Sequence, residues 1–296
     1  MSARKPPKKR RPKASREPPP VPAAPIAGER ALHLAPRGGP DAIVVGDLHI
    51  GIETEYAFGG VKIPSGTPAM VGRIISAHRA TGATKLVIAG DLKHSTSAIT
   101  EQEGLEVPRA LEELSGTFEE VVIVPGNHDG RIEELVPKRA ANVHLAPAGG
   151  HLCRGGLLVI HGHAWPDPAL AKRARGLAVA HNHTAIALED ALGRVHKEAC
   201  WARGRVNPEK WKDKTGGSNY PEVILLPPFN ELCTGVPINV PGVTPIGPLL
   251  REGCVDLARA EVYLLDGVFL GRVRALELSV TTGALRRLSR GVSEDL

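Results

Sequence analysis

The sequence has no apolar run that approaches the roughly 20 residues of a membrane-spanning helix. Its first twenty residues are basic, but no apolar stretch of about 7–15 residues follows them, as a secretory signal requires. Cysteine is scarce, and no C-x-x-C pair occurs. The cysteines are therefore expected to be small buried hydrophobic residues rather than disulfide partners or zinc ligands. The four cysteines are Cys153, Cys200, Cys233 and Cys254. These absences predict a soluble cytoplasmic protein that does not bind membranes.

The net charge of +5 is distributed unevenly along the chain. Residues 1–20 contain eight basic residues and one acidic residue, whereas the rest of the chain contains 29 basic and 31 acidic residues. Ten of the 26 prolines lie in the first forty residues, and such a segment can neither bury apolar surface nor form a stable helix. We therefore expect residues 1–38 to form a disordered tail and residues 39–296 to form one domain. The tail is compatible with contacts to nucleic-acid phosphates, and equally with a solubilising extension that has no specific partner.

From residue 41 onward, short apolar runs alternate with helical patterns. Five runs rich in aliphatic residues predict buried strands, at 42–45, 86–89, 121–124, 157–160 and 177–180. Helices are expected at 68–80, with Thr67 as N-cap and Gly82 just past the end, and at 101–114. This order predicts an α/β layered core. Past residue 185 we expect strands at 223–226, 261–265 and 268–270, the last two joined by a tight turn at Asp266-Gly267.

A polar cluster follows each of the five predicted buried strands. The clusters are Gly46-Asp47-Leu48-His49, Gly90-Asp91-Leu92-Lys93-His94, Pro125-Gly126-Asn127-His128-Asp129, His161-Gly162-His163 and His181-Asn182-His183. Ligands of open α/β sheets bind outside the carboxyl ends of the strands, so these clusters are expected to share one rim. A single Asp or Asn after Gly is more typical of a turn, but five clusters in order indicate a site.

The mixture of imidazole, carboxylate and amide groups predicts a metal centre. Imidazole with carboxylate suits Mn, Fe or Zn. The clusters hold more potential ligands than one tetrahedral ion can use, and a carboxylate such as Asp91 can bridge two ions. Two ions about 3.5–4 Å apart are a known device for phosphoryl hydrolysis. The glycines before Asp47, Asp91 and Asn127 are expected to let the backbone approach the ions closely.

The five clusters resemble the motifs of the calcineurin-like metallophosphoesterases, D-x-H, G-D, G-N-H-[DE], H and G-H-x-H, which they match in order within residues 44–184. The resemblance implies a four-layer αββα sandwich and two divalent transition metals, Mn first, with Fe or Zn as alternatives. It implies a first metal held by Asp47, His49 and His183, and a second held by Asn127, His161 and His181. Asp91 would bridge both, and His128 would protonate the leaving group. The ions would lower the pKa of the attacking water and neutralise charge on the phosphoryl oxygens.

Two positions depart from the usual family pattern. Ala180 stands where the last motif usually has Gly, and His94 stands where many phosphatases have the second Asp of G-D-x-x-D. In having a histidine at this position, the sequence resembles the SbcD-like repair exonuclease branch, in which that histidine assists the catalytic histidine. Gly51-Ile52-Glu53, Ile63-Pro64 and residues 226–239 are similar to the SbcD-related archaeal and DNA ligase-associated bacterial phosphoesterases. The sequence leaves open whether Lys93 contacts substrate or is an exposed cap residue.

Residues 194–220 interleave basic residues with Trp201, Trp211 and Tyr220. Basic groups can follow a phosphate backbone while aromatic rings stack on bases, so Arg203, Arg205 and the two tryptophans are candidate substrate contacts. On composition alone, a solvated loop with its aromatics against the core is favoured. With the tail and the subgroup resemblance, the expected function is a DNA-repair nuclease with a nucleic-acid partner. The alternatives are a small-molecule phosphodiesterase or phosphatase, and a non-catalytic nucleic-acid-binding subunit with structural metals.

Overall fold

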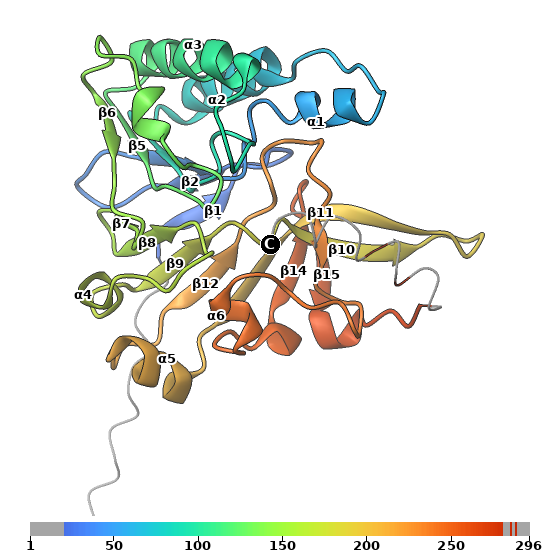
Figure 1. Ribbon diagram of the computed structural model, residues 1–296. Helices are drawn as coiled ribbons and strands as arrows, with labels where there is room; N and C mark the ends of the chain where they lie inside the picture. The colour runs from blue at the N-terminus through green and yellow to red at the C-terminus, as the bar shows by residue number, and fades with distance from the viewer. Residues whose placement is uncertain (1–20, 281–284, 286–287, 289–296) are drawn as a thin grey trace, which may run out of the picture.

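The computed structural model describes residues 21–280, 285 and 288. Two β-sheets pack face to face, and helices cover the outer face of each sheet (Figure 1). This arrangement is the four-layer αββα sandwich that the sequence predicts. Within the described ranges, every helix is too short or too polar to cross a membrane.

The first sheet contains six strands that follow one another in chain order. They are β1 (Ala23–Pro25), β2 (Leu32–Leu34), β3 (Ala42–Val45), β4 (Lys85–Ile88), β5 (Glu120–Ile123) and β6 (Val143–Leu145). The strands from β3 to β6 are parallel, whereas β1 and β2 run antiparallel to their neighbours. The expected strands in this sheet are each confirmed to within one residue at either end.

Three helices connect the strands of the first sheet, namely α1 (Glu53–Phe58), α2 (Thr67–Thr81) and α3 (Glu101–Thr117). Thr67 is the first residue of α2 and Gly66 is its N-cap, so the expected cap at Thr67 was wrong by one position. Gly82 ends α2 in the left-handed conformation that favours glycine, as expected. Helix α3 begins with a capping box between Thr100 and Glu103.

The predicted tail extended too far into the chain. Strand β2 pairs with β3, and its residues Leu32 and Leu34 are buried between the two sheets. Residues 21–38 therefore contribute two strands to the folded domain. Their strands have only three residues each and lie in a proline-rich stretch, which is why composition did not reveal them. The basic residues 1–20 lie outside the described part of the chain.

The second sheet has nine strands, with β8, β9 and β12 parallel at its centre. They are β7 (His151–Leu152), β8 (Leu157–Ile160), β9 (Gly176–Val179), β10 (Thr184–Glu189), β11 (Val195–Arg205), β12 (Glu222–Leu225), β13 (Val236–Pro237), β14 (Glu261–Leu264) and β15 (Phe269–Arg272). Three helices lie on its outer side, α4 (Pro168–Ala171), α5 (Pro208–Thr215) and α6 (Pro248–Arg251). The short 3₁₀ turns are η1 (Ile132–Glu134), η2 (Leu257–Arg259) and η3 (Val273–Ala275). The predicted turn at Asp266-Gly267 joins β14 to β15.

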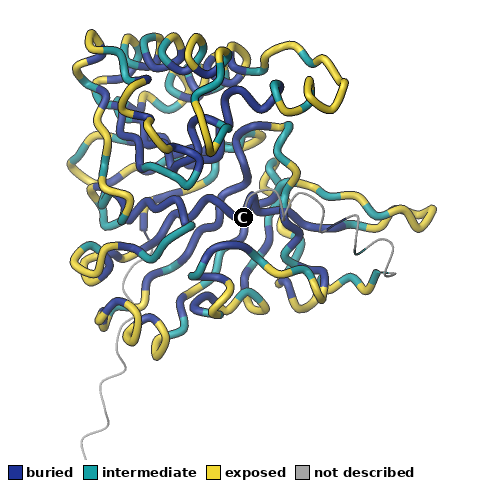
Figure 2. The backbone as a smooth tube through the Cα atoms, viewed as in Figure 1, coloured by how far each residue is buried: buried dark blue, intermediate teal, exposed yellow. Residues whose placement is uncertain are grey.

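Burial on both faces explains the continuous apolar runs of the parallel strands. In β3, Ile43 and Val45 pack against the helices, whereas Val44 packs against the other sheet. In β8, Leu158 and Ile160 point outward and Leu157 points between the sheets. Strands with helices on one side and a sheet on the other have no solvated face, so no polar residue interrupts them. Figure 2 shows this dark-blue interior, with exposed residues gathered at helix surfaces and loop tips.

Candidate metal centre

The structure gathers the predicted site residues at the carboxyl ends of five parallel strands. The loop after β3 carries Asp47 and His49, and the loop after β4 carries Asp91 and His94. The loops after β5, β8 and β9 carry Asn127, His128, His161, His181 and His183. Both sheets therefore contribute to one rim, because β3, β4 and β5 belong to the first sheet and β8 and β9 to the second.

A first group of ligand atoms comes from Asp47, His49, Asp91 and His183. One ligand atom of each residue lies within 4.8 Å of the others, and all four residues are buried. The Nε2 atoms of His49 and His183 face each other at 3.1 Å. His49 Nε2 is 3.6 Å from Asp91 Oδ2, and His183 Nε2 is 3.6 Å from Asp47 Oδ1.

A second group shares Asp91 with the first. Ligand atoms of Asp91, His161 and His181 lie within 4.8 Å of one another. His161 Nε2 is 3.1 Å from Asp91 Oδ2 and 3.0 Å from the side-chain oxygen of Asn127. The carboxylate of Asp91 thus lies between the two groups, which is the position that a bridging ligand requires.

The residues of both groups fit divalent transition metals. Asp47 Oδ1 accepts a hydrogen bond from the backbone N–H of His181 at 3.1 Å, whereas the buried Oδ2 accepts none from the described residues and is available to a cation. Two imidazole nitrogens 3.1 Å apart can share only one proton, whereas both can bind the same ion. Imidazole, carboxylate and amide together are the donor set of Mn, Fe and Zn sites.

The backbone at the rim is strained. Among the described residues, six that are not glycine have a positive φ, and five of these belong to the two ligand groups. They are Asp47, His49, Asp91, His181 and His183, with φ between 43° and 64°. Such conformations cost free energy and persist where the surrounding structure enforces them, commonly at functional sites.

Two glycines make room for the ligands. A Cβ atom at Gly90 would lie 2.4 Å from His161 Nδ1, and a Cβ atom at Gly126 would lie 2.1 Å from Asp91 Oδ1. Both contacts are far too short, so only glycine fits at either position. The unusual Ala180 packs against Gly46, at which a Cβ atom would come within 2.7 Å of the Ala180 methyl group. The methyl group of Ala180, where the family usually has glycine, thus fits because the residue opposite it is Gly46.

Burial sets the protonation of the metal-free centre. It raises the pKa of Asp47 to about 6 and lowers the pKa of His181 to about 3, because neither charge is solvated. Burial also opposes the charges of Asp91 and His161, but each favours the ionised form of the other. The pKa of Asp91 is therefore well below its usual range, and the pKa of His161 rises to about 9.

His128 and His94 adjoin the first ligand group. One ring nitrogen of each of His49, His94 and His128 lies within 4.8 Å of the corresponding nitrogens of the other two residues. The backbone N–H of His128 donates to Asp91 Oδ1 at 3.0 Å, and its Nδ1 donates to the carbonyl oxygen of His94. His128 Nε2 lies 4.0 Å from Asp91 Oδ2. The ring of His128 is therefore fixed with Nε2 beside the carboxylate of Asp91.

Several residues that position the site were not predicted. Glu55 Oε2 lies 2.5 Å from His94 Nε2. Asp129 accepts hydrogen bonds from the backbone N–H groups of Leu92 at 2.9 Å and Gly126 at 2.8 Å, tying two ligand loops together. Lys93 is 1% exposed, and its ammonium donates to the carbonyl oxygens of Ser95 and His128. It is therefore neither an exposed cap nor a group free to bind substrate. Asp129 and Lys93 belong to the polar clusters seen in the sequence, which did not reveal their positioning roles, whereas Glu55 has no distinctive local pattern.

The predicted substrate contacts in residues 194–220 are not confirmed. Trp201 and Trp211 are completely buried, in the core between the sheets and in the core beneath α5, respectively. Neither indole can stack on a base, so the candidate contacts at the two tryptophans were wrong, whereas the alternative favoured by composition, with aromatics against the core, is confirmed for them. Arg203 pairs with Glu222 at 2.7 Å, and Arg205 is exposed at the end of β11. The segment forms a long central strand and an amphipathic helix rather than a binding loop.

A cavity of about 650 Å³ opens beside the first ligand group. His49, His94, His128 and His183 lie on one side of it. The other lining residues come from the segment 51–61, which contains α1, from the loop between β4 and α3, and from residues 232–234. A substrate in this cavity would contact both the histidines and the first metal position.

The chain matches the family described as calcineurin-like phosphoesterase over residues 41–221, and it belongs to that family. Members of the family are metal-dependent hydrolases that bind two divalent metals. The resemblance seen in the sequence is thereby confirmed at the level of the superfamily.

Two solved structures resemble the chain at low identity. The first is the nuclease MPE of Pseudomonas putida, with 18% identity, a TM-score of 0.45, and coverage of 82% of this chain and 97% of that one. The second is the phosphoesterase YfcE of E. coli, with 18% identity, a TM-score of 0.33, and coverage of 54% of this chain and 86% of that one. No curated protein sequence matches the chain.

Proposed function

We propose that this phosphoesterase hydrolyses phosphodiester bonds in nucleic acid, as a nuclease of the DNA-repair type. The observation that supports a two-metal mechanism is the sharing of Asp91 between two buried ligand groups. Asp47, His49 and His183 would hold the first ion, Asn127, His161 and His181 would hold the second, and Asp91 would serve both. When bound, the ions neutralise charge on the phosphoryl oxygens and lower the pKa of the attacking water. Mn is proposed as the first choice of metal, with Fe or Zn as alternatives at either position.

His128 is proposed as the acid that protonates the leaving oxygen. Its Nδ1 is occupied by the carbonyl oxygen of His94, so Nε2 is the atom left to deliver a proton. His94 lies between His128 and Glu55, and its ring stacks on that of His128 with centroids 5.6 Å apart. The orientation of His128 therefore depends on His94, in keeping with the assisting role implied for that position.

The size of the cavity, about 650 Å³, is consistent with a substrate larger than a phosphate ion. At its rim lies Phe58, which is 88% exposed and offers an aromatic face on which a base can stack. This single aromatic residue replaces the two tryptophans as the proposed base contact. The non-catalytic alternative is disfavoured, because the family is enzymatic and the acid position retains His128.

A small phosphodiester is the second candidate substrate. The described residues that line the cavity include neither lysine nor arginine, whereas a long nucleic-acid backbone is usually followed by a row of cations. This observation favours a substrate with one diester group over a polymer.

Hydrolysis of bis-(p-nitrophenyl) phosphate and of single- and double-stranded DNA, with added Mn and with EDTA, separates the candidates. Mn-dependent cleavage of DNA supports the nuclease. Cleavage of the small diester alone moves the assignment to a small-molecule phosphodiesterase. If neither is cleaved by protein that carries both ions, the phosphodiesterase proposal is wrong and a phosphomonoester becomes the substrate to test.

A further inference from the structure

Cys233 differs from the other three cysteines in its surroundings. Cys153, Cys200 and Cys254 are buried in hydrophobic clusters, as the sequence predicts. Cys233 is partly exposed and lines the cavity together with His49 and His183. The expectation of a buried hydrophobic role therefore fails for this cysteine alone.

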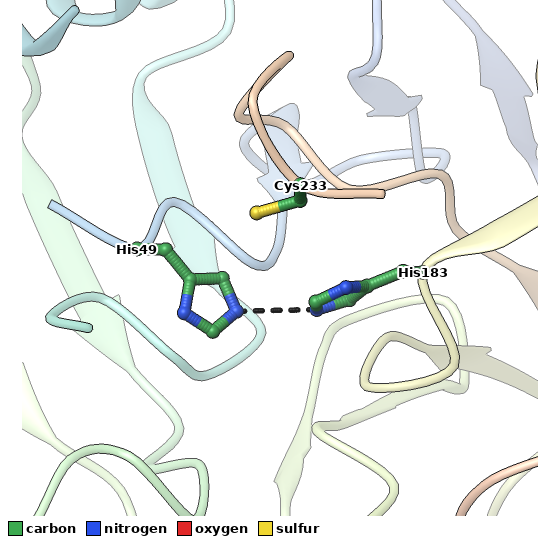
Figure 3. A group of neighbouring side chains, drawn as sticks. All are labelled: His49, His183 and Cys233. Carbon is green, nitrogen blue, oxygen red and sulfur yellow. Dashed lines mark hydrogen bonds between the residues drawn. The ribbon is translucent and has the colours of Figure 1, made fainter. Parts of the chain in front are cut away.

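The thiol of Cys233 forms a group with the two histidines of the first ligand group, although not with its two carboxylates. Its Sγ and one nitrogen each of His49 and His183 lie within 4.8 Å of one another. Figure 3 shows the two imidazoles facing each other, with Cys233 beside them on a neighbouring loop. Ligands about 2.0–2.1 Å from one ion for nitrogen and about 2.3 Å for sulfur produce separations of this order.

A second observation indicates that a cation belongs at this position. Asp47, which forms a group with the same two histidines, is fully buried, and its Oδ2 has no hydrogen-bond donor among the described residues. The cavity is lined by the two histidines and Cys233, but not by Asp47 or Asp91. The carboxylates therefore approach the first position from within the protein and the sulfur from the cavity.

The loop that carries Cys233 is fixed to the loops that carry the ligands. Before the cysteine, the N–H of Asn230 donates to the Asp47 carbonyl at 3.2 Å, and its side-chain amide donates to the Leu48 carbonyl at 2.8 Å. After it, the N–H of Val236 donates to the His183 carbonyl at 2.9 Å. Cys233 is thus held between the two histidines by hydrogen bonds at both ends of its loop.

We propose that Cys233 supplies a sulfur ligand to the first metal ion, beyond the ligands that the family motifs provide. The inference depends on the metal centre proposed above. On binding, the thiol releases its proton to solvent and a sulfur–metal bond forms. Thiolate favours Zn over Mn, which prefers oxygen ligands. The first position therefore selects Zn, whereas the second, with only nitrogen and oxygen donors, accepts Mn.

Cobalt absorption tests the sulfur ligand directly, because Co²⁺ replaces Zn²⁺ and reports thiolate through a near-ultraviolet charge-transfer band. The metal-free protein is titrated with Co²⁺ as wild type, as Cys233→Ala and as the matched control Cys153→Ala. We expect the band in wild type and in C153A, and its loss in C233A. Two bound cobalt ions without the band, or a band that persists in C233A, would overturn the sulfur ligand and leave the metal centre standing. Absence of any bound cobalt would overturn the metal centre and, with it, this inference.

Metal competition provides a readout that does not depend on colour. Titrations of wild type and C233A with Zn²⁺ and with Mn²⁺ give the affinity of the tighter site for each ion. Loss of a supporting partner typically costs about 10- to 100-fold in metal affinity, and loss of a ligand is expected to cost at least as much. We expect this weakening for Zn²⁺ and a smaller change for Mn²⁺. Equal affinities of wild type and C233A for Zn²⁺ would contradict the proposal.

Discussion

The rim at the strand ends and residues 194–220 both stand out in the sequence as candidate functional regions, but they have opposite structural roles. At the rim, charged groups such as Asp47 and Asp91 are completely buried, and five of the ligand residues have strained backbones. In residues 194–220, Trp201 and Trp211 are the buried groups, and charges such as those of Arg203 and Lys214 pair at the surface. Burying charge and straining the backbone both cost free energy, so their coincidence indicates function. Buried aromatics with paired surface charges require only the ordinary stability of a folded domain.

The largest effect is expected from Asp91→Asn, which removes the shared charge of the rim. Activity should fall to the level of EDTA-treated wild type, because neither ligand group is complete without this carboxylate. The matched control is Asp213→Asn on the exposed face of α5, which should retain wild-type activity. The comparison fails if the two variants lose activity to the same extent in a diester hydrolysis assay.

His128→Asn is expected to lower kcat by roughly 10²–10⁴-fold, the usual contribution of a general acid. Metal content should not change, because neither of the two groups that share Asp91 contains His128. His144→Asn on the exposed surface of β6 serves as the control. Normal turnover by the His128 variant at full metal content would remove this residue from the mechanism.

Trp211→Ala should affect stability rather than chemistry. Removing a fully buried tryptophan leaves a cavity and costs roughly 3–5 kcal/mol of the free energy of unfolding. Tyr220→Ala, at a residue that is 46% exposed, should cost much less. Chemical denaturation measures both, and the activity of the remaining folded Trp211 variant should equal that of wild type. A stable Trp211 variant with a selective defect on DNA would restore the stacking role.

The smallest effect is expected from Arg203→Ala. Its pair with Glu222 is partly exposed, and such pairs contribute about 1 kcal/mol or less. Cleavage of DNA and of the small diester should both remain near wild type. A loss confined to DNA would instead make β11 a substrate surface and break the distinction between the two regions.

The fold and the site could be predicted from sequence where strands are buried on both faces. The five strands that carry the site have continuous apolar runs for this reason, so the residues at which they end can be recognised. The ligand residues follow those ends directly, and parallel strands gather them at one rim. Strand β11 escaped notice because its first half mixes polar and apolar residues on a partly exposed surface.

Positions fixed by distant contacts could not be predicted locally. Cys233 reaches the first metal position because Asn230 binds the loop of Asp47 and Val236 binds His183, residues distant in the sequence. Glu55 of α1 reaches His94, in the loop after β4, in the same way. Nothing in the sequence around either residue distinguishes it from an ordinary loop or helix position.

Metal content per chain tests the central claim most directly. The wild-type protein, loaded with Mn and Zn and freed of unbound ions, is analysed by elemental mass spectrometry beside Asp91→Asn. We expect two ions per wild-type chain, as the family has, and weakened binding at both positions in the variant. A single ion in wild type, or a variant that loses one ion while the other binds unchanged, would contradict a centre in which Asp91 is shared.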